Sequence, residues 1–224
     1  MGYEAPWLYP EGKIKRYISP EDIPLFLKYV GETVRYYRGR VDVWEIWNEP
    51  NLMFWKGSNS EFFELSRLTA EKIREVDPGA FIIGGVFWRT PAAFIKSMYK
   101  AGAMDSLDGL AFHPYAINPR GSMNVYDKFL DVLSEINFTG SVWITEMGYP
   151  TAGWYPTKVS LNEFPSYVTK TITGAAARGA NVLVWYEMYD SFNDGEVPPK
   201  TRNSEHFFGL VYPDLQRKNG AWAY

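Results

Sequence analysis

Five short runs rich in β-branched and aromatic residues recur along the chain, and segments with helical patterning separate them. The candidate strands are Val41–Trp47, Ala80–Phe87, Gly109–Tyr115, Ser141–Glu146 and Asn181–Tyr186. The expected helices are Ser19–Tyr37, Ser60–Val76, Pro91–Ala101, Val125–Ile136 and Leu161–Ala177. The strands start at residues 41, 80, 109, 141 and 181, so the intervals are 39, 29, 32 and 40 residues. This alternation predicts an α/β protein built from successive βα units around a parallel sheet.

The ends of these strands favour a closed barrel over an open sheet. The chain has neither a Gly-x-Gly-x-x-Gly turn after the first strand nor a Gly-Lys-Ser/Thr loop, which are typical of open sheets that bind nucleotides. Polar and aromatic residues instead gather at four carboxyl ends, in Asn48–Asn51, His113–Tyr115, Thr145–Met147 and Trp185–Glu187. Barrel enzymes place their chemistry at these ends, so we expect a (β/α)8 TIM barrel.

The length of the chain indicates that this barrel is incomplete. Units of about 35 residues would require roughly 280 residues for eight strands, a usual size for this fold, whereas the chain has 224. The shortage lies at the front, because residues 1–18 resemble a loop and the first clear element is a helix. We therefore expect one N-terminally truncated domain spanning residues 1–224, with the first two to three strands missing.

The composition leaves carboxylate side chains as the main candidates for catalytic groups. The net charge is 23 − 26 = −3, which argues against a nucleic-acid partner. There is no cysteine, and His113 and His206 are the two histidines, so we expect no metal site and no cofactor. No apolar run approaches the ~18 residues that would indicate a membrane span. Aromatic residues make up 17% of the chain, which fits either surfaces that stack on flat ligands or an aromatic core.

Glu49 and Glu146 are the candidate catalytic residues, and each ends a predicted strand. A facing pair of carboxyl groups is what cleavage of a glycosidic bond requires, with one group protonating the leaving oxygen and the other attacking the anomeric carbon. Asn48 precedes Glu49 and can donate its amide hydrogens to a sugar hydroxyl. The alternative is that each glutamate pairs with a surface lysine or arginine.

Two motifs carry a resemblance to a known group of enzymes. Trp-Glu-Ile-Trp-Asn-Glu-Pro-Asn (Trp44–Asn51) and Trp-Ile-Thr-Glu-Met-Gly-Tyr (Trp143–Tyr149) resemble the glycoside hydrolases of clan A, most closely families 39 and 5. The resemblance implies that Glu49, on the fourth strand, is the general acid/base and that Glu146, on the seventh, is the nucleophile. It thus implies a retaining hydrolase that cleaves β-glycosidic bonds in oligo- or polysaccharides by double displacement.

The same resemblance assigns further substrate-binding residues. Asp108–Tyr115 is similar to the sixth strand of the clan, where the histidine and tyrosine equivalent to His113 and Tyr115 line the site. Val182–Tyr186 is similar to the eighth strand, which makes Trp185 the floor under the reacting sugar. His113 could instead be a structural histidine, and Trp185 could instead belong to the core.

The front of the chain departs from this pattern. Gly2–Trp7 resembles the end of a third strand, so we expect strands one, two and most of three to be missing. The fourth strand would then expose an unpaired edge, and we predict that the chain self-associates through the open side of the barrel or is a fragment of a longer protein. The alternative function is therefore an inactive barrel fragment that binds carbohydrate or self-associates.

Overall fold

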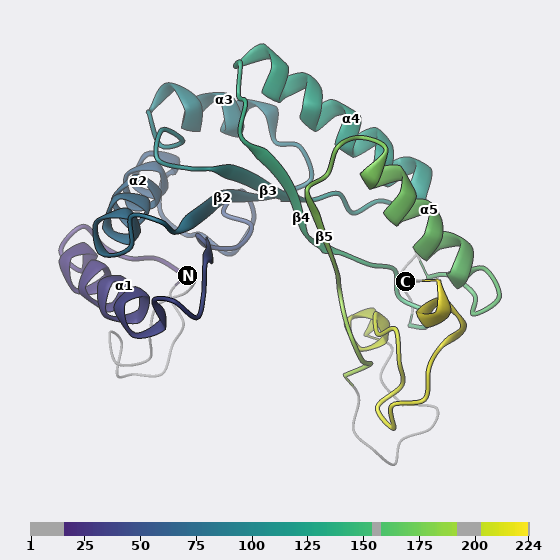
Figure 1. Ribbon diagram of the computed structural model, residues 1–224. Helices are drawn as coiled ribbons and strands as arrows, with labels where there is room; N and C mark the ends of the chain where they lie inside the picture. Colours follow the sequence, from purple (N-terminus) through teal and green to yellow (C-terminus); the bar gives the residue numbers. More distant parts are fainter. Residues whose placement is uncertain (1–15, 154–157, 192–202, 224) are drawn as a thin grey trace. The chain divides into compact units, whose positions relative to one another are not determined.

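The computed structural model describes residues 16–153, 158–191 and 203–223. Five helices alternate with five strands (Figure 1). The helices are α1 (Ile23–Tyr37), α2 (Asn59–Val76), α3 (Ala92–Lys100), α4 (Pro119–Glu135) and α5 (Phe164–Ala176), and the strands are β1 (Val43–Glu45), β2 (Phe81–Trp88), β3 (Gly109–His113), β4 (Ser141–Met147) and β5 (Val182–Trp185). Short 3₁₀ helices follow at Ser204–Phe207 and Asn219–Trp222. All ten predicted elements are confirmed, and the third-strand segment Gly2–Trp7 lies outside the described residues.

The strands follow one another in the sheet in chain order, β1-β2-β3-β4-β5. β1 pairs with β2 in parallel, and β4 pairs with β5 in parallel. A helix between each strand and the next is the arrangement of a (β/α)8 barrel, and the five βα units make an incomplete one, as predicted.

The chain divides into two compact units. The first contains the described residues up to Phe112 together with Phe129–Val142, and the second contains His113–Lys128 and the described residues from Trp143 onward. Each unit is described separately below.

Aromatic side chains fill the core of the first unit. Phe62, on α2, has its ring centroid 6.0 Å from that of Phe94 on α3, and Phe87 lies 5.9 Å from Phe94. Phe112 stacks on Phe129 with centroids 4.2 Å apart and ring planes 9° apart. Many of the aromatic residues therefore serve packing, which is one of the two explanations that the composition left open.

In the second unit, α5 packs its apolar face on β5 and on the segment after β4. The rings of Phe164 and Trp185 lie 6.0 Å apart, and those of Tyr149 and Tyr167 lie 5.0 Å apart. Pro165 stands in the first turn of α5, where its missing N–H costs no hydrogen bond.

Two of the element boundaries that differ from the prediction have an identifiable local reason. β1 is shorter than Val41–Trp47 because Trp47 (φ 67°) and Glu49 (φ 42°) adopt left-handed backbone conformations that end the strand. α4 begins at Pro119 rather than Val125, because the side chain of Asn118 accepts a hydrogen bond from the Gly121 N–H at 2.9 Å and caps the helix.

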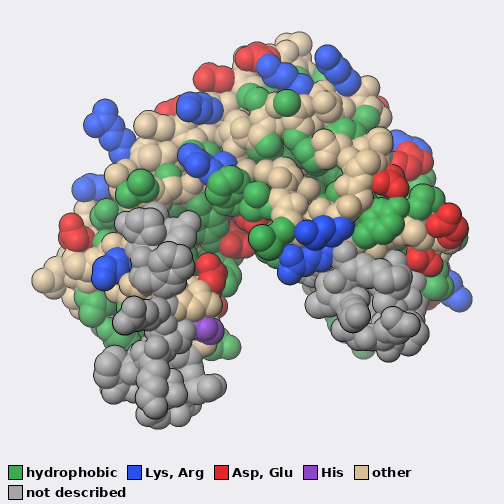
Figure 2. All heavy atoms as spheres, turned by 180° about the vertical axis from the view of Figure 1, so that it is seen from behind, with side chains coloured by type: hydrophobic (Ala, Val, Ile, Leu, Met, Phe, Trp, Pro, Cys, Tyr) green, Lys and Arg blue, Asp and Glu red, His purple; other side chains and the backbone are tan. Residues whose placement is uncertain are grey.

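The surface carries charges of both signs. On the face drawn in Figure 2, acidic and basic side chains are interspersed among apolar ones. In the part of the chain that the structure describes, no helix is both long enough and apolar enough to cross a membrane.

Candidate active site

Glu49 lies in a tight turn directly after β1, in the first unit. Its backbone N–H donates to the Val86 carbonyl of β2 at 2.8 Å, and its own carbonyl accepts from the Leu52 N–H at 3.0 Å. The residue is only 7% exposed. The positive φ of 42° is unusual for a side chain other than glycine, asparagine or aspartate, and such strained positions occur often at functional sites.

Asn51 fixes this turn to the end of the neighbouring strand. Its amide nitrogen donates to the Trp88 carbonyl at 3.0 Å, and its amide oxygen accepts from the Trp88 N–H at 2.9 Å. The Asn51 side chain thus makes the two hydrogen bonds to the Trp88 backbone that a neighbouring strand would make. Asn48, the residue before Glu49, is half-buried.

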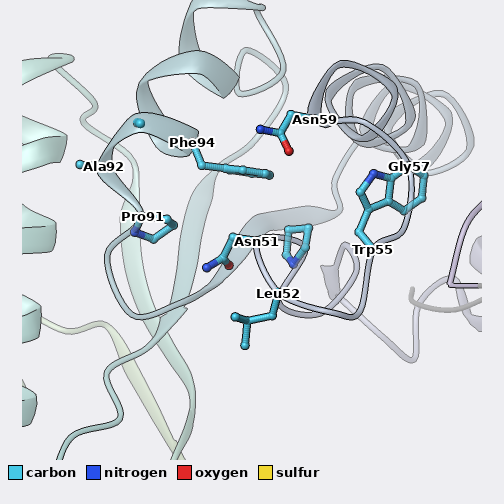
Figure 3. Close-up of a pocket in the computed structure, with 10 residues that line it drawn as sticks. Asn51, Leu52, Trp55, Gly57, Asn59, Pro91, Ala92 and Phe94 are labelled. Carbon is cyan, nitrogen blue, oxygen red and sulfur yellow. The ribbon is translucent and has the colours of Figure 1, made fainter.

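A pocket of about 530 Å³ borders the same turn. Pro50, Asn51 and Leu52 form one part of its wall, and Figure 3 shows Asn59 and Phe94 approaching each other from the starts of α2 and α3. Such a volume is in the range of small-molecule sites.

Glu146 occupies the carboxyl end of β4, in the second unit, and is held by two residues from the end of β3. The Tyr115 hydroxyl donates to Glu146 Oε1 at 2.6 Å, and His113 Nδ1 lies 3.8 Å from Glu146 Oε2. His113 is 1% exposed, and its Nε2 lies 3.2 Å from the Thr145 hydroxyl. A hydroxyl that donates to a carboxylate stabilises the ionised form, which is the form that a nucleophile requires.

An irregularity in β4 explains how two successive side chains reach the same partners. The β4–β5 register shifts between Ile144, which pairs with Leu183, and Met147, which pairs with Trp185. A bulge of this kind re-aims side chains, and here both Thr145 and Glu146 contact residues at the end of β3.

The glycine that follows this strand permits a close backbone approach. A Cβ at Gly148 would overlap the carbonyl oxygen of Tyr186, in the segment after β5. The close packing of the two backbones therefore requires a glycine in the middle of the Met-Gly-Tyr sequence that follows Glu146.

Trp185 is the last residue of β5, and Tyr186 follows it. Trp185 is 6% exposed, and its ring contacts Phe164 of α5 and Tyr149. Tyr186 directly follows the strand, and its ring lies 5.4 Å from that of Phe208. Burial and the nearby charges of Glu187, Glu205 and Glu146 raise the pKa of Tyr186 to about 12.

Tyr186 and Phe208, which the sequence interpretation did not assign to the site, lie near Glu146 and Tyr115 respectively. The ring of Phe208 meets Tyr115 edge-on at 6.2 Å and Tyr186 at 5.4 Å. No sequence signal places Phe208 beside Tyr115, because the two residues lie far apart along the chain.

The predicted site residues thus fall in both units. Asn48 and Glu49 belong to the first. His113, Tyr115, Glu146 and Trp185 belong to the second, where the structure brings Glu146, Tyr115 and His113 into one cluster and packs Trp185 against α5.

Comparisons with known proteins agree with this description. No protein-family model matches the chain. A family 39 glycoside hydrolase from Bacteroides cellulosilyticus WH2 superposes with a TM-score of 0.78 and 26% identity, over 98% of this chain and 47% of that chain. A 60-residue stretch is 45% identical to a β-xylosidase of Geobacillus stearothermophilus, covering 23% of this chain and 12% of that protein.

Two other solved structures are similar at lower identity. A monomeric β-xylosidase from Caulobacter crescentus CB15 has a TM-score of 0.72 and 19% identity, over 95% of this chain and 47% of that chain. The family 39 enzyme of Xanthomonas axonopodis pv. citri has a TM-score of 0.70 and 21% identity, over 91% of this chain and 45% of that chain. Both similarities establish the fold alone.

The chain therefore has the incomplete (β/α)8 barrel fold of clan A glycoside hydrolases. Within that class it is similar to the enzymes of family 39, and it spans about half the length of the solved relatives that it matches.

Proposed function

We propose that this chain carries the two-glutamate site of a retaining glycoside hydrolase that cleaves β-glycosidic bonds in oligo- or polysaccharides. The observation that supports this most directly is the Tyr115–Glu146 hydrogen bond of 2.6 Å at the carboxyl end of a barrel strand. It fits a carboxylate kept ionised for attack. The similarity to family 39 supplies the second support.

In the first step, Glu146 attacks the anomeric carbon while the bond to the leaving oxygen breaks. The carboxylic acid of Glu49 gives its proton to that oxygen, which leaves as an alcohol. In the second step, the Glu49 carboxylate takes a proton from water as the water oxygen attacks the anomeric carbon, and the bond to Glu146 breaks. Two inversions give net retention, and no metal or cofactor takes part.

The other residues orient the sugar in this proposal. The Asn48 amide bonds a sugar hydroxyl next to the reacting carbon, and His113 and Tyr115 position Glu146. The stacking role of Trp185 stays a prediction. We add Tyr186 as a sugar contact because it follows β5 directly and lies close enough to Glu146 for their charges to interact.

Two of the similar proteins are named β-xylosidases, so an aryl β-xyloside is the first substrate to try. The test is hydrolysis of aryl xyloside, glucoside, galactoside, mannoside and arabinoside by the parent chain and by Glu146→Gln and Glu49→Gln. Loss of an acid/base group costs roughly 10²–10⁴-fold in rate, and Glu146→Gln should abolish turnover.

Added azide distinguishes the acid/base role proposed for Glu49 from the nucleophile role proposed for Glu146. With Glu49→Ala, azide should restore turnover and give the β-glycosyl azide, because the glycosyl-enzyme still forms and a small anion replaces the activated water. Asp127→Asn, at an exposed ion pair on α4, is the control and should keep full activity. Turnover that survives in Glu146→Gln would contradict the proposal.

A second candidate is a non-catalytic barrel fragment that binds carbohydrate or self-associates. It is favoured by exposed apolar residues on strands: Val43 of β1 is 38% exposed and Val184 of β5 is 46% exposed. A folded chain that binds xylo-oligosaccharides without cleaving any aryl glycoside would support this candidate.

A further inference from the structure

The second unit contains a buried ion pair that the proposed mechanism does not use. Lys218 Nζ lies 2.6 Å from Asp190 Oδ1, and their side chains are 0% and 1% exposed. The pair is well removed along the sequence from Glu146, yet it occupies the interior of the same unit.

Lys218 links three separate segments. Its ammonium group donates to the Thr151 hydroxyl at 2.8 Å, in the segment after β4, and to the Phe207 carbonyl at 3.3 Å. Its backbone N–H donates to the Leu210 carbonyl at 3.0 Å. Asp190, in the segment after β5, accepts from the Gly209 N–H at 2.9 Å. Residues 207–210 are therefore held by both members of the ion pair.

Phe208 stands in the middle of this fixed segment. Its ring is the edge-on neighbour of Tyr115 at 6.2 Å, and Tyr115 donates to Glu146 at 2.6 Å. A displacement of Phe208 would remove one of the packing contacts of the Tyr115 ring. The Tyr115 hydroxyl would then be less firmly oriented toward Glu146.

Burying the charges of Lys218 and Asp190 costs free energy, so stability alone is a poor explanation for this ion pair. Burial raises the pKa of Asp190 and lowers the pKa of Lys218, because the loss of hydration outweighs their attraction for each other. Buried ion pairs can often be replaced by apolar residues of similar volume without loss of stability, so a contribution to stability is weak grounds for this pair.

We propose that Lys218 and Asp190 are positioning residues that fix Phe208 and, through it, the Tyr115–Glu146 hydrogen bond. An effect of this positioning on the reaction rate rests on the proposed function, because it assumes that Glu146 is the nucleophile. An effect on the titration of the Glu146 carboxyl group does not depend on that assumption.

The first experiment follows the titration of Glu146 by NMR in the full chain labelled with ¹³C at glutamate carboxyl carbons. Tyr115→Phe is the reference variant, and it should move the titration midpoint upward by about one pH unit, since a hydrogen bond to the charged form is lost. Lys218→Met should also move the Glu146 titration midpoint upward, by a smaller but measurable amount than Tyr115→Phe. Among the described residues of this unit, His113 and Tyr186 are titratable groups near Glu146, and neither is substituted in these variants.

Matched variants separate positioning from folding. Lys218→Met combined with Asp190→Leu leaves no unpaired buried charge, so the protein should stay folded while the titration still moves. Lys218→Arg keeps the charge and should restore most of the parent behaviour. Arg178→Met breaks the exposed pair with Asp127 in the same unit and should leave Glu146 unchanged.

Kinetics supply the second readout. Lys218→Met should lower kcat for an aryl glycoside about tenfold with little change in KM, and Tyr115→Phe should add little further loss, because both variants disturb one hydrogen bond. A folded Lys218→Met/Asp190→Leu chain whose Glu146 titration matches the parent, while Tyr115→Phe shifts it, would overturn the inference. No turnover in any variant, with the titration moving as expected, would refute the proposed function and leave the positioning role standing.

Discussion

Asn51 illustrates how a single side chain can complete a piece of sheet. Its amide makes both hydrogen bonds to the backbone of Trp88 that a neighbouring strand would otherwise make. The turn containing Glu49 is thereby tied to the end of β2, so an asparagine two residues after the candidate acid/base has a structural role.

Asn51→Ala should therefore lower the free energy of unfolding by about 1–3 kcal/mol, because the Trp88 N–H and carbonyl lose their partner. The measurement is urea denaturation followed by tryptophan fluorescence. Asn59→Ala, at an exposed position at the start of α2, is the control and should change stability little. Equal stability of both variants would show that water replaces Asn51 without cost.

At the scale of elements, α2 has the best-defined start. Ser58 and Glu61 form a reciprocal capping box, with the Ser58 N–H donating to Glu61 Oε2 at 2.7 Å. The Tyr17 hydroxyl also donates to Glu61 Oε1 at 2.5 Å. This hydrogen bond, followed by those from Ser58, holds the pKa of Glu61 below its usual value of 4.5.

The sign of the pH dependence follows from that shift. A carboxyl with a lowered pKa in the folded state contributes stability above its unfolded pKa and loses it as the pH falls through the folded value. The stability difference between the parent and Glu61→Gln should therefore be present at pH 6 and should shrink as the pH falls below 4.5. Thermal unfolding across this range, with Glu75→Gln from the same helix as control, measures it. A difference that is independent of pH would contradict the assignment.

At the scale of the whole molecule, we predict self-association through strands that carry exposed apolar side chains. Val184, on β5, is 46% exposed, and an exposed strand edge is a template for pairing with another chain.

Val184→Lys should weaken self-association at least tenfold, because a charge on the strand must be desolvated at any interface. Sedimentation velocity over a range of concentrations measures the effect. Thr169→Lys, on the exposed side of α5, adds the same charge elsewhere and should have no effect. A parent chain that remains monomeric at every concentration would remove the basis for this prediction.

Local patterns were sufficient to predict the helices and strands, whereas the role of Glu146 stays a prediction. Hydrophobic runs, prolines and glycines depend on neighbours a few residues away, so the alternation of strands and helices could be predicted along the chain. The expected start of α4 at Val125 was wrong, because the Asn118 cap stabilises a helix from Pro119 onward. Tyr115 was selected through the resemblance, and its hydroxyl does reach Glu146.

The sequence by itself determined the βα units and the chemical groups at the strand ends, since both depend on local order. Only the tertiary structure decided which of these side chains meet. Next to the register shift in β4, both Thr145 and Glu146 contact His113, and Trp185 packs on α5. Lys218 and Asp190 pair across 28 residues. Such contacts depend on strand register and on segments far apart in the chain, which no local pattern specifies.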